Sequence, residues 1–266
     1  MTGLCRICGD VTELSFEHVP PRAAFNNRRT TTADISRLIG SDDPNALEQP
    51  ARGHISQRGA GAYTLCVKCN NTTGHWYGSA YVDWAAQGLM LLQASGRSPS
   101  LYHIFHIFPL RVLKQIICMF FSANSPNFRD RHEDLVRFVL NRDAKYLDPK
   151  VRVYAFYHLG DRSRQSGVST LVQLSDDGFS ARSKIFSEIT WPPFGYVLSL
   201  DSEPPDDDLL DISGFAHYRY KEWTDVQLRL RAKEIYSWLP GDYRSREEVR
   251  ETFRANVEQR RRLRDG

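Results

Sequence analysis

Two Cys-x-x-Cys pairs are the most specific signal of chemical function in this sequence. The pairs are Cys5 with Cys8 and Cys66 with Cys69. Each pair can hold a metal from a tight turn, and two pairs supply the four thiolates of a tetrahedral zinc site. We therefore predict one structural Zn²⁺ bound by all four side chains. The fifth cysteine, Cys118, lies in an apolar run and is predicted to be a small core residue.

A second group of polar residues lies close to the cysteines. Glu17 and His18 stand side by side just before two prolines, and Asn70 directly follows Cys69. Prolines end a regular strand, so the acid-His pair is expected at a strand end. A zinc ion that joins the cysteine pairs closes the loop between them and brings a carboxylate, an imidazole and a carboxamide into one neighbourhood. The zinc is then structural, and the chemistry lies beside it.

This order of residues resembles that of the HNH endonucleases in their zinc-containing ββα-metal, or treble-clef, form. The shared pattern is Cys-x-x-Cys, an acid-His pair followed by x-Pro, and Cys-x-x-Cys-Asn opening a helix, and it covers about residues 1–90. The resemblance implies that His18 is the general base that activates water. It also implies that Glu17 and Asn70 hold a catalytic divalent ion, Mg²⁺ in preference to Mn²⁺. The chemistry agrees, because an ordinary imidazole titrates at about pH 6.5 and hard cations prefer oxygen ligands.

The sequence departs from this family pattern at one position that matters. The family usually has an Asn or His shortly before the second cysteine pair, and the segment QRGAGAYTLC (57–66) has neither. Arg58 or His54 is a candidate substitute, and loss of catalysis is the alternative. Asn71 and His75 lie four residues apart, on one face of the expected helix, and are further candidates for metal ligands. An exposed helix cap and a surface histidine are the simpler interpretation of that pair.

Basic residues near the acid-His pair are candidates for contacts with nucleic acid. Phosphate groups supply most of the nonspecific affinity for nucleic acid, and guanidinium groups bind them. A solvated loop is the alternative for these arginines, which are Arg22, Arg28, Arg29 and Arg58. The chain carries a net charge of +3, and residues 244–266 hold eight arginines against five acidic residues. The basic character is therefore concentrated in the C-terminal segment, for which a charged, solvated helix is predicted.

The pattern along the chain predicts an α+β fold in three parts. We expect a ββα-metal zinc module at 1–95, an α+β domain at 96–243 and a basic C-terminal helix at 244–266. One helix is predicted to begin at the second cysteine pair, and a core helix over 104–121, with Pro109 able to open it. Asp-Asp-Gly at 176–178 predicts a hairpin turn. A mostly antiparallel sheet is predicted from short β-rich runs at 151–159, 169–174, 179–185, 194–200, 216–223 and 225–230.

These observations favour a metal-dependent endonuclease that acts on DNA rather than RNA. Two alternatives belong to other classes: a non-catalytic zinc module that binds nucleic acid or a protein, and a nuclease gated by a ligand or partner of the C-terminal domain. The first residues, MTGLCRICGD, lack the apolar stretch of a secretory signal, and no window reaches the length of a membrane span. A cytoplasmic protein without a membrane partner is therefore expected.

Overall fold

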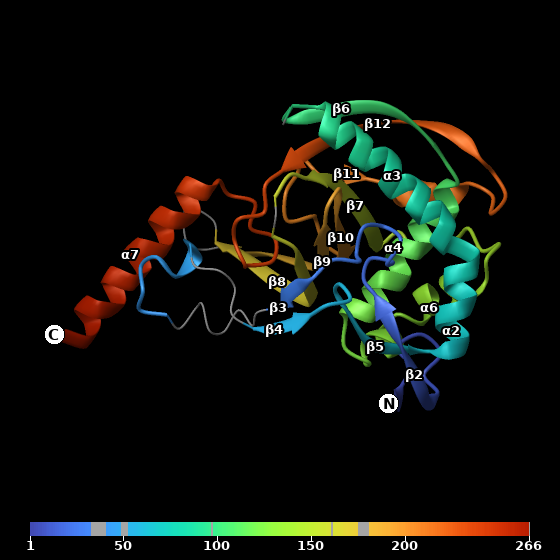
Figure 1. Ribbon diagram of the computed structural model, residues 1–266, viewed down its shortest axis with the longest axis horizontal. Helices are drawn as coiled ribbons and strands as arrows, with labels where there is room; N and C mark the ends of the chain where they lie inside the picture. Colours follow the sequence, from blue (N-terminus) through green and yellow to red (C-terminus); the bar gives the residue numbers. More distant parts are fainter. Residues whose placement is uncertain (33–40, 49–52, 97, 161, 175–180, 266) are drawn as a thin grey trace.

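The chain begins with a small antiparallel sheet followed by a helix. The structure, a computed structural model, describes residues 1–32, 41–48, 53–96, 98–160, 162–174 and 181–265. Strand β2 is paired with β1 on one side and with β5 on the other. Three strands and a helix thus surround the cysteine pairs (Figure 1): β1 (Thr2–Leu4), β2 (Val11–His18), β5 (Gly61–Cys66) and α2 (Val67–Thr73).

The helix that begins at the second cysteine pair continues far beyond it. α2 leads through a π-helix, η2 (Gly74–Gly78), into α3 (Ser79–Ala94). The Trp84 ring stacks on Phe194 with centroids 4.5 Å apart. A Cβ at Gly88 would lie 2.3 Å from the same Phe194 ring, so this close approach requires glycine. The buried stripe of this helix agrees with the periodicity in the sequence. Three helices follow: α4 (Pro109–Ala123), α5 (Phe128–Arg131) and α6 (Glu133–Leu140).

The second half of the chain forms a large, mostly antiparallel sheet. The strand order is β6-β12-β7-β10-β9-β8, with β11 also paired to β7. Only the pairing of β12 with β7 is parallel among the described strands. The strands are β6 (Ser100–Ile107), β7 (Val151–His158), β8 (Arg164–Leu174), β9 (Ala181–Trp191), β10 (Phe194–Leu200), β11 (Leu210–Asp211) and β12 (Thr224–Lys233). The predicted turn at 176–178 lies outside the described residues, although β8 and β9, which flank it, are antiparallel.

Helix α4 lies at the centre of the molecule, between the N-terminal module and the sheet (Figure 1). Thirteen of its 15 residues are buried, so it is surrounded on nearly every side. It contacts β5 and η2 of the module and β8, β9 and β10 of the sheet. Cys118 is 1% exposed and belongs to this core, as predicted. One hydrophobic cluster contains residues from both sides of position 95, where the boundary between the zinc module and the α+β domain is predicted. That domain boundary stays a prediction.

The apolar run at 104–121 does not form one helix, although Pro109 opens a helix as predicted. Residues 104–107 belong to β6, and α4 begins at Pro109. Phe105 and Ile107 are buried while Ile104 and His106 are exposed, which is the two-residue period of a strand. The apolar run therefore covers two elements, because a strand and a buried helix are hard to distinguish in a short apolar run.

The strand predicted at 216–223 is also wrong. The 3₁₀-helix η3 (Ser213–His217) and turns occupy this segment. Aromatic residues here pack against helices instead of pairing in the sheet: the Tyr220 hydroxyl donates to the Trp76 carbonyl at 3.2 Å, and Arg111 lies over the Tyr220 ring. Alternating aromatic residues resemble a strand in sequence, but here tertiary packing decides the conformation.

The C-terminal helix α7 (Arg246–Asp265) is joined to the long insert between the cysteine pairs (Figure 1). In the insert, β3 (Thr30–Thr32) pairs with β4 (His54–Ser56), and η1 (Ala46–Glu48) lies near α7. The Glu48 carboxylate accepts hydrogen bonds from Tyr236, Arg246 and Arg250. Several arginines of α7 thus hold the insert instead of being free in solvent. No helix in the described part of the chain is both long and apolar enough to cross a bilayer.

Candidate functional site

The four paired cysteines lie together, as their spacing predicts. Cys5 and Cys8 lie in the turn after β1, Cys66 ends β5 and Cys69 lies in the first turn of α2. All four sulfur atoms are within 4.8 Å of one another, and the Cys8 and Cys66 sulfurs are 3.8 Å apart. The Cys66 sulfur also accepts a hydrogen bond from the Cys69 N–H, so it caps the helix. The cluster can hold one tetrahedral metal ion such as zinc.

Burial and contacts between the sulfur atoms shift the pKa values of three thiols in the cluster. A hydrogen bond from the Cys69 thiol lowers the pKa of Cys5 to about 4. Burial raises the pKa of Cys8 to about 12, and the contact with Cys5 raises the pKa of Cys69. Negative charge thus collects on the Cys5 sulfur, while Cys8 and Cys69 keep their protons. A divalent cation cancels the mutual repulsion and favours the thiolate at all four positions.

Purified protein is expected to contain about one zinc ion per chain, because the cluster supplies one complete set of four ligands. Cys69→Ser should lower the zinc content to a small fraction of this value. Cys118→Ala is the matched control, because Cys118 is equally buried but lies outside the cluster. Metal analysis by mass spectrometry on the folded proteins measures both. Full zinc content in the Cys69 variant would contradict the assignment.

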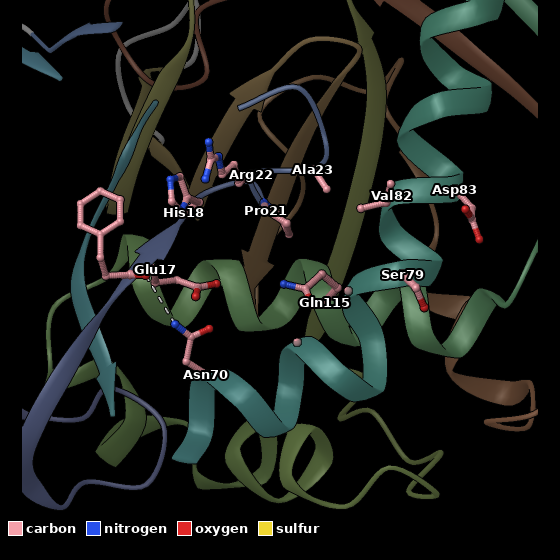
Figure 2. Close-up of a pocket in the computed structure, with 13 residues that line it drawn as sticks. Glu17, His18, Pro21, Arg22, Ala23, Asn70, Ser79, Val82, Asp83 and Gln115 are labelled. Atoms are coloured by element: carbon pink, nitrogen blue, oxygen red, sulfur yellow. Dashed lines mark hydrogen bonds between the residues drawn. The ribbon is translucent and has the colours of Figure 1, made fainter. Parts of the chain in front are cut away.

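Strand β2 places Glu17 and His18 at the edge of the module. Antiparallel pairing with β5 sets Glu17 opposite Ala62 and His18 opposite Gly61. Successive side chains of a strand point to opposite faces, so the carboxylate and the imidazole diverge. Figure 2 shows this: the Glu17 carboxylate extends toward α4, and the His18 ring extends away from it. Each of the two side chains can therefore have a separate task.

The His18 ring is held in one orientation by its neighbours. Its Nε2 lies 2.9 Å from the main-chain oxygen of Arg58, and the Phe16 ring packs edge-on against it with centroids 4.9 Å apart. A carbonyl oxygen only accepts hydrogen bonds, so Nε2 carries the proton and Nδ1 has the free lone pair when the ring is neutral. His18 thus offers an oriented proton acceptor at the protein surface.

Glu17 and Asn70 present oxygen atoms on the other face of β2. Glu17 is 8% exposed, and burial raises its pKa to about 7. Its carboxylate accepts no hydrogen bond and meets no cation at ion-pair distance within the described residues. The Asn70 Nδ2 donates to the Ser15 hydroxyl at 3.0 Å and to the Phe16 carbonyl at 3.5 Å. Because the amide nitrogen is bound to β2, the amide oxygen is left for another partner.

These side chains line one pocket of ≈ 600 Å³ (Figure 2). The pocket lies between β2, the α2–η2–α3 helix and α4, and Arg22 reaches it from the loop after the prolines. The structure therefore brings together the acid, the histidine, the asparagine and one of the predicted arginines. No protein-family model, curated protein or solved structure matches this chain. The resemblance to HNH endonucleases therefore depends on the residues and their geometry alone.

The loop that follows His18 is fixed by two residues that the sequence did not point to. Asn26 is fully buried; its Nδ2 donates to the carbonyls of Pro20 and Ala60, both at 2.7 Å, and its Oδ1 accepts from the Ala60 N–H at 2.7 Å. From the large sheet, Gln165 donates to the Val19 carbonyl at 2.6 Å. Asn26 thus ties the loop after β2 to the segment before β5, a task that the family pattern would give to an asparagine or histidine nearer the second cysteine pair.

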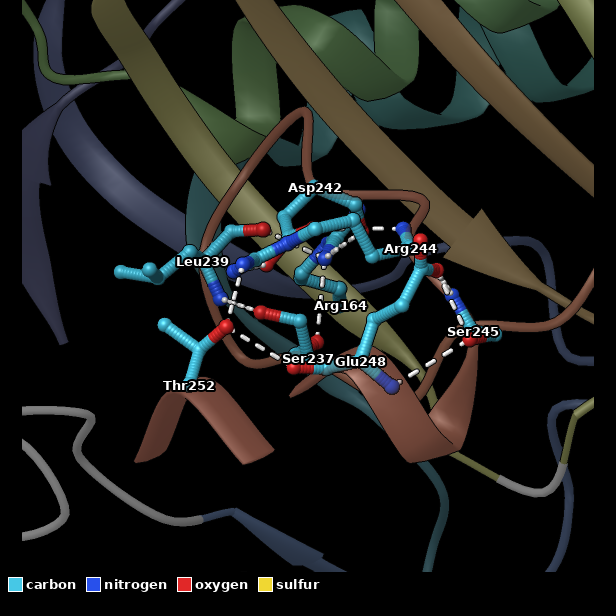
Figure 3. A network of polar contacts seen from close by, with 8 residues as sticks. All are labelled: Arg164, Ser237, Leu239, Asp242, Arg244, Ser245, Glu248 and Thr252. Atoms are coloured by element: carbon cyan, nitrogen blue, oxygen red, sulfur yellow. Dashed lines mark hydrogen bonds and ion pairs between the residues drawn. The ribbon is translucent and has the colours of Figure 1, made fainter. Parts of the chain in front are cut away.

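Strand β8, which supplies Gln165, is anchored by its neighbour Arg164 (Figure 3). The Arg164 guanidinium is 5% exposed and pairs with the buried Glu188 at 2.6 Å. It also donates to the main-chain carbonyls of Ser237, Leu239 and Asp242, in the connection that leads to α7. Strand β8 is therefore tied to the segment that leads into α7.

Helix α7 begins with a reciprocal cap. The Ser245 N–H and hydroxyl donate to the Glu248 carboxylate, and the Glu248 N–H donates to the Ser245 hydroxyl oxygen.

The remaining predicted residues do not line the pocket. Arg28, Arg29 and Arg58 are exposed, and Arg58 serves His18 through its main-chain oxygen. Asn71 and His75 are exposed on the outer face of the helix, as the simpler interpretation has it, and neither lines the pocket. His54 is exposed on β4, and no contact connects it to His18 within the described residues.

Proposed function

We propose that this protein is a metal-dependent endonuclease of the HNH type that hydrolyses phosphodiester bonds, with DNA as its preferred substrate. The observation that carries the proposal is the buried Glu17 carboxylate, which has no partner among the described residues and shares a pocket with Asn70, the residue after Cys69 of the cysteine cluster. A buried charge without a partner is costly, and residues of this kind are concentrated at functional sites.

The donor set of this pocket fits a hard divalent cation. Glu17 and Asn70 offer a carboxylate and an amide oxygen, which are ligands that Mg²⁺ and Mn²⁺ prefer over thiolates and imidazoles. When bound there, such an ion would polarise the phosphate and stabilise the leaving oxygen. The cysteine cluster, whose ligands are all sulfur, favours zinc instead. The two sites therefore select different metals through ligand type.

His18 is suited to take the proton from the attacking water. The Nδ1 lone pair accepts the proton, and the Arg58 carbonyl, which accepts the Nε2–H, stabilises the imidazolium that forms. The charge of Arg22 at the pocket can hold a substrate phosphate, and the exposed Arg28, Arg29 and Arg58 are further candidates for phosphate contacts. Because such contacts are made to the phosphate backbone of the nucleic acid, they imply binding with little sequence preference.

Purified protein incubated with supercoiled plasmid and Mg²⁺ or Mn²⁺ tests the proposal. Nicked and linear DNA should appear, a chelator should stop their formation, and added Mg²⁺ should restore it. Single-stranded RNA in a parallel reaction measures the preference between nucleic acids. A gel shift of the DNA without any cleavage, with either ion, would contradict the proposal and support a non-catalytic binding module.

Two glycines in the wall of the pocket allow a further test. Gly74 and Gly78 line the pocket and have helical backbone angles (φ −61°, ψ −42° and φ −57°, ψ −44°). A Cβ at either would meet nothing within 4 Å, so packing does not require glycine. Glycine in a helix costs roughly 0.5–1 kcal/mol relative to alanine. The bare backbone is thus better explained by close approach of a substrate.

Gly78→Ala is therefore expected to raise the free energy of unfolding by roughly 0.5–1 kcal/mol and to lower the rate of plasmid cleavage. Chemical denaturation and a nicking assay measure the two effects. Gly214→Ala is the matched control, because an added Cβ there also meets nothing within 4 Å and Gly214 lies outside the pocket. Unchanged cleavage by the Gly78 variant would show that the pocket wall tolerates a methyl group.

A further inference from the structure

Gln115 is a polar residue in α4, a buried helix whose other side chains are mostly apolar. It lies in the middle of α4 and is 2% exposed. Its Oε1 is fully buried and has no hydrogen-bond partner among the described residues. The other buried polar residue at this level, Lys114, has its partners in the carbonyls of Asn141 and Arg142. Buried amides are nearly always hydrogen-bonded, so an Oε1 without a partner among the described residues is an exception that needs an explanation.

The Gln115 side chain enters the same pocket as Glu17 and Asn70. All three line it, and Figure 2 shows the Gln115 amide directed from α4 toward the Glu17 carboxylate. Glu17 comes from β2, Asn70 from α2 and Gln115 from α4, so the three approach from different sides. None of the oxygen atoms that they offer accepts a hydrogen bond within the described part of the chain.

We infer that Gln115 is a third protein oxygen ligand of the divalent cation held by Glu17 and Asn70. This inference depends on the proposed function. Amide oxygens of Asn and Gln are regular ligands of hard cations, and a set of three from three directions leaves positions for water and phosphate. In Figure 2 the amide nitrogen is the atom nearer to Glu17. A half-turn about the last side-chain torsion turns the oxygen toward the pocket and the nitrogen to the buried side, and it breaks no hydrogen bond between Oε1 and the described residues.

The inference extends the site beyond the segment that resembles HNH endonucleases. Residue 115 lies outside the module predicted at 1–95, on the helix that connects this module to the sheet. The cation then holds β2, α2 and α4 together. Its affinity depends on the packing of α4 and not only on the acid-His pair.

Manganese binding to the full-length zinc-loaded protein tests this assignment without any measurement of activity. Titration with Mn²⁺, followed by electron paramagnetic resonance of the free ion, gives the affinity. Gln115→Leu should weaken it roughly 10-fold or more, since loss of a ligand has at least the effect of losing a supporting residue. Gln115→Glu should bind Mn²⁺ at least as tightly as the wild type at pH 8, because it adds a charged oxygen ligand.

Two controls separate the possible results. Gln87→Leu, on α3 and outside the pocket, should leave the affinity unchanged. Thermal unfolding and zinc content confirm that Gln115→Leu is folded, which is expected because it replaces a bare buried amide with an apolar side chain of similar size. Equal Mn²⁺ affinity of this variant and the wild type would overturn the assignment of Gln115 alone. A wild-type protein that binds no Mn²⁺ would contradict both this inference and the proposed cation site.

Discussion

His18→Ala is expected to abolish phosphodiester cleavage while the zinc content and the fold stay intact. The imidazole is the proton acceptor of the proposed reaction, and general base catalysis contributes roughly 10²–10⁴-fold to a rate. The ring contributes little to the core: it lies at the surface, and its ordered contacts are one hydrogen bond to the Arg58 carbonyl and the edge of Phe16. Nicking of supercoiled plasmid, zinc analysis and circular dichroism measure the three properties.

His75→Ala provides the matched control for this substitution. His75 is exposed on η2, which belongs to the same module, and it does not line the pocket. Its removal should leave the rate of nicking unchanged. Nicking by the His18 variant at the wild-type rate would exclude His18 as the base, and equal loss in both variants would point to a structural effect.

The parts of the site that could be predicted are those encoded by neighbouring residues. A Cys-x-x-Cys pair fixes its own turn, and Asn70 follows Cys69 directly, so spacing alone predicted which residues gather at the cluster. The two prolines after Val19 likewise predicted that β2 ends at His18. Local backbone chemistry determines these features, and it is visible in one sequence.

The residues that complete the site could not be predicted, because their contacts connect distant segments. Asn26 meets Ala60 across 34 positions, and Gln165 meets Val19 across 146. Each looks in the sequence like an ordinary loop or strand residue. Gln115 has a weak signal, because a lone amide in a strongly apolar helix is uncommon, but only the fold shows that it faces Glu17. A prediction of long-range partners needs the topology, which periodicity alone does not supply.

Glu17→Gln is expected to stabilise the protein above neutral pH in the absence of added divalent cations. Burial raises the pKa of Glu17 from 4.5 to about 7 in the folded protein. The unfolded chain loses this proton near pH 4.5, whereas the folded chain keeps it until about pH 7. The free energy of unfolding of the wild type therefore falls as the pH rises through this window. The loss reaches about 3 kcal/mol above pH 7, and glutamine, which has no such ionisation, avoids it.

Denaturation curves from pH 4 to pH 9 give the free energy of unfolding of the wild type and of the Glu17 variant. The difference between the two reports on Glu17 alone, because all other ionisable groups are common to both proteins. Glu13→Gln, at an exposed position of the same strand, should change the curve little. Added Mn²⁺ at 100 times its dissociation constant should stabilise the wild type by about 2.7 kcal/mol and should stabilise the Glu17 variant clearly less, because the variant lacks the charged ligand. A variant less stable than the wild type at pH 8 without cations would mean that Glu17 has a structural partner. The expected result is that the Glu17 carboxylate destabilises the metal-free fold and that a bound cation offsets this loss of stability. A metal ligand behaves in this way, and a structural residue does not.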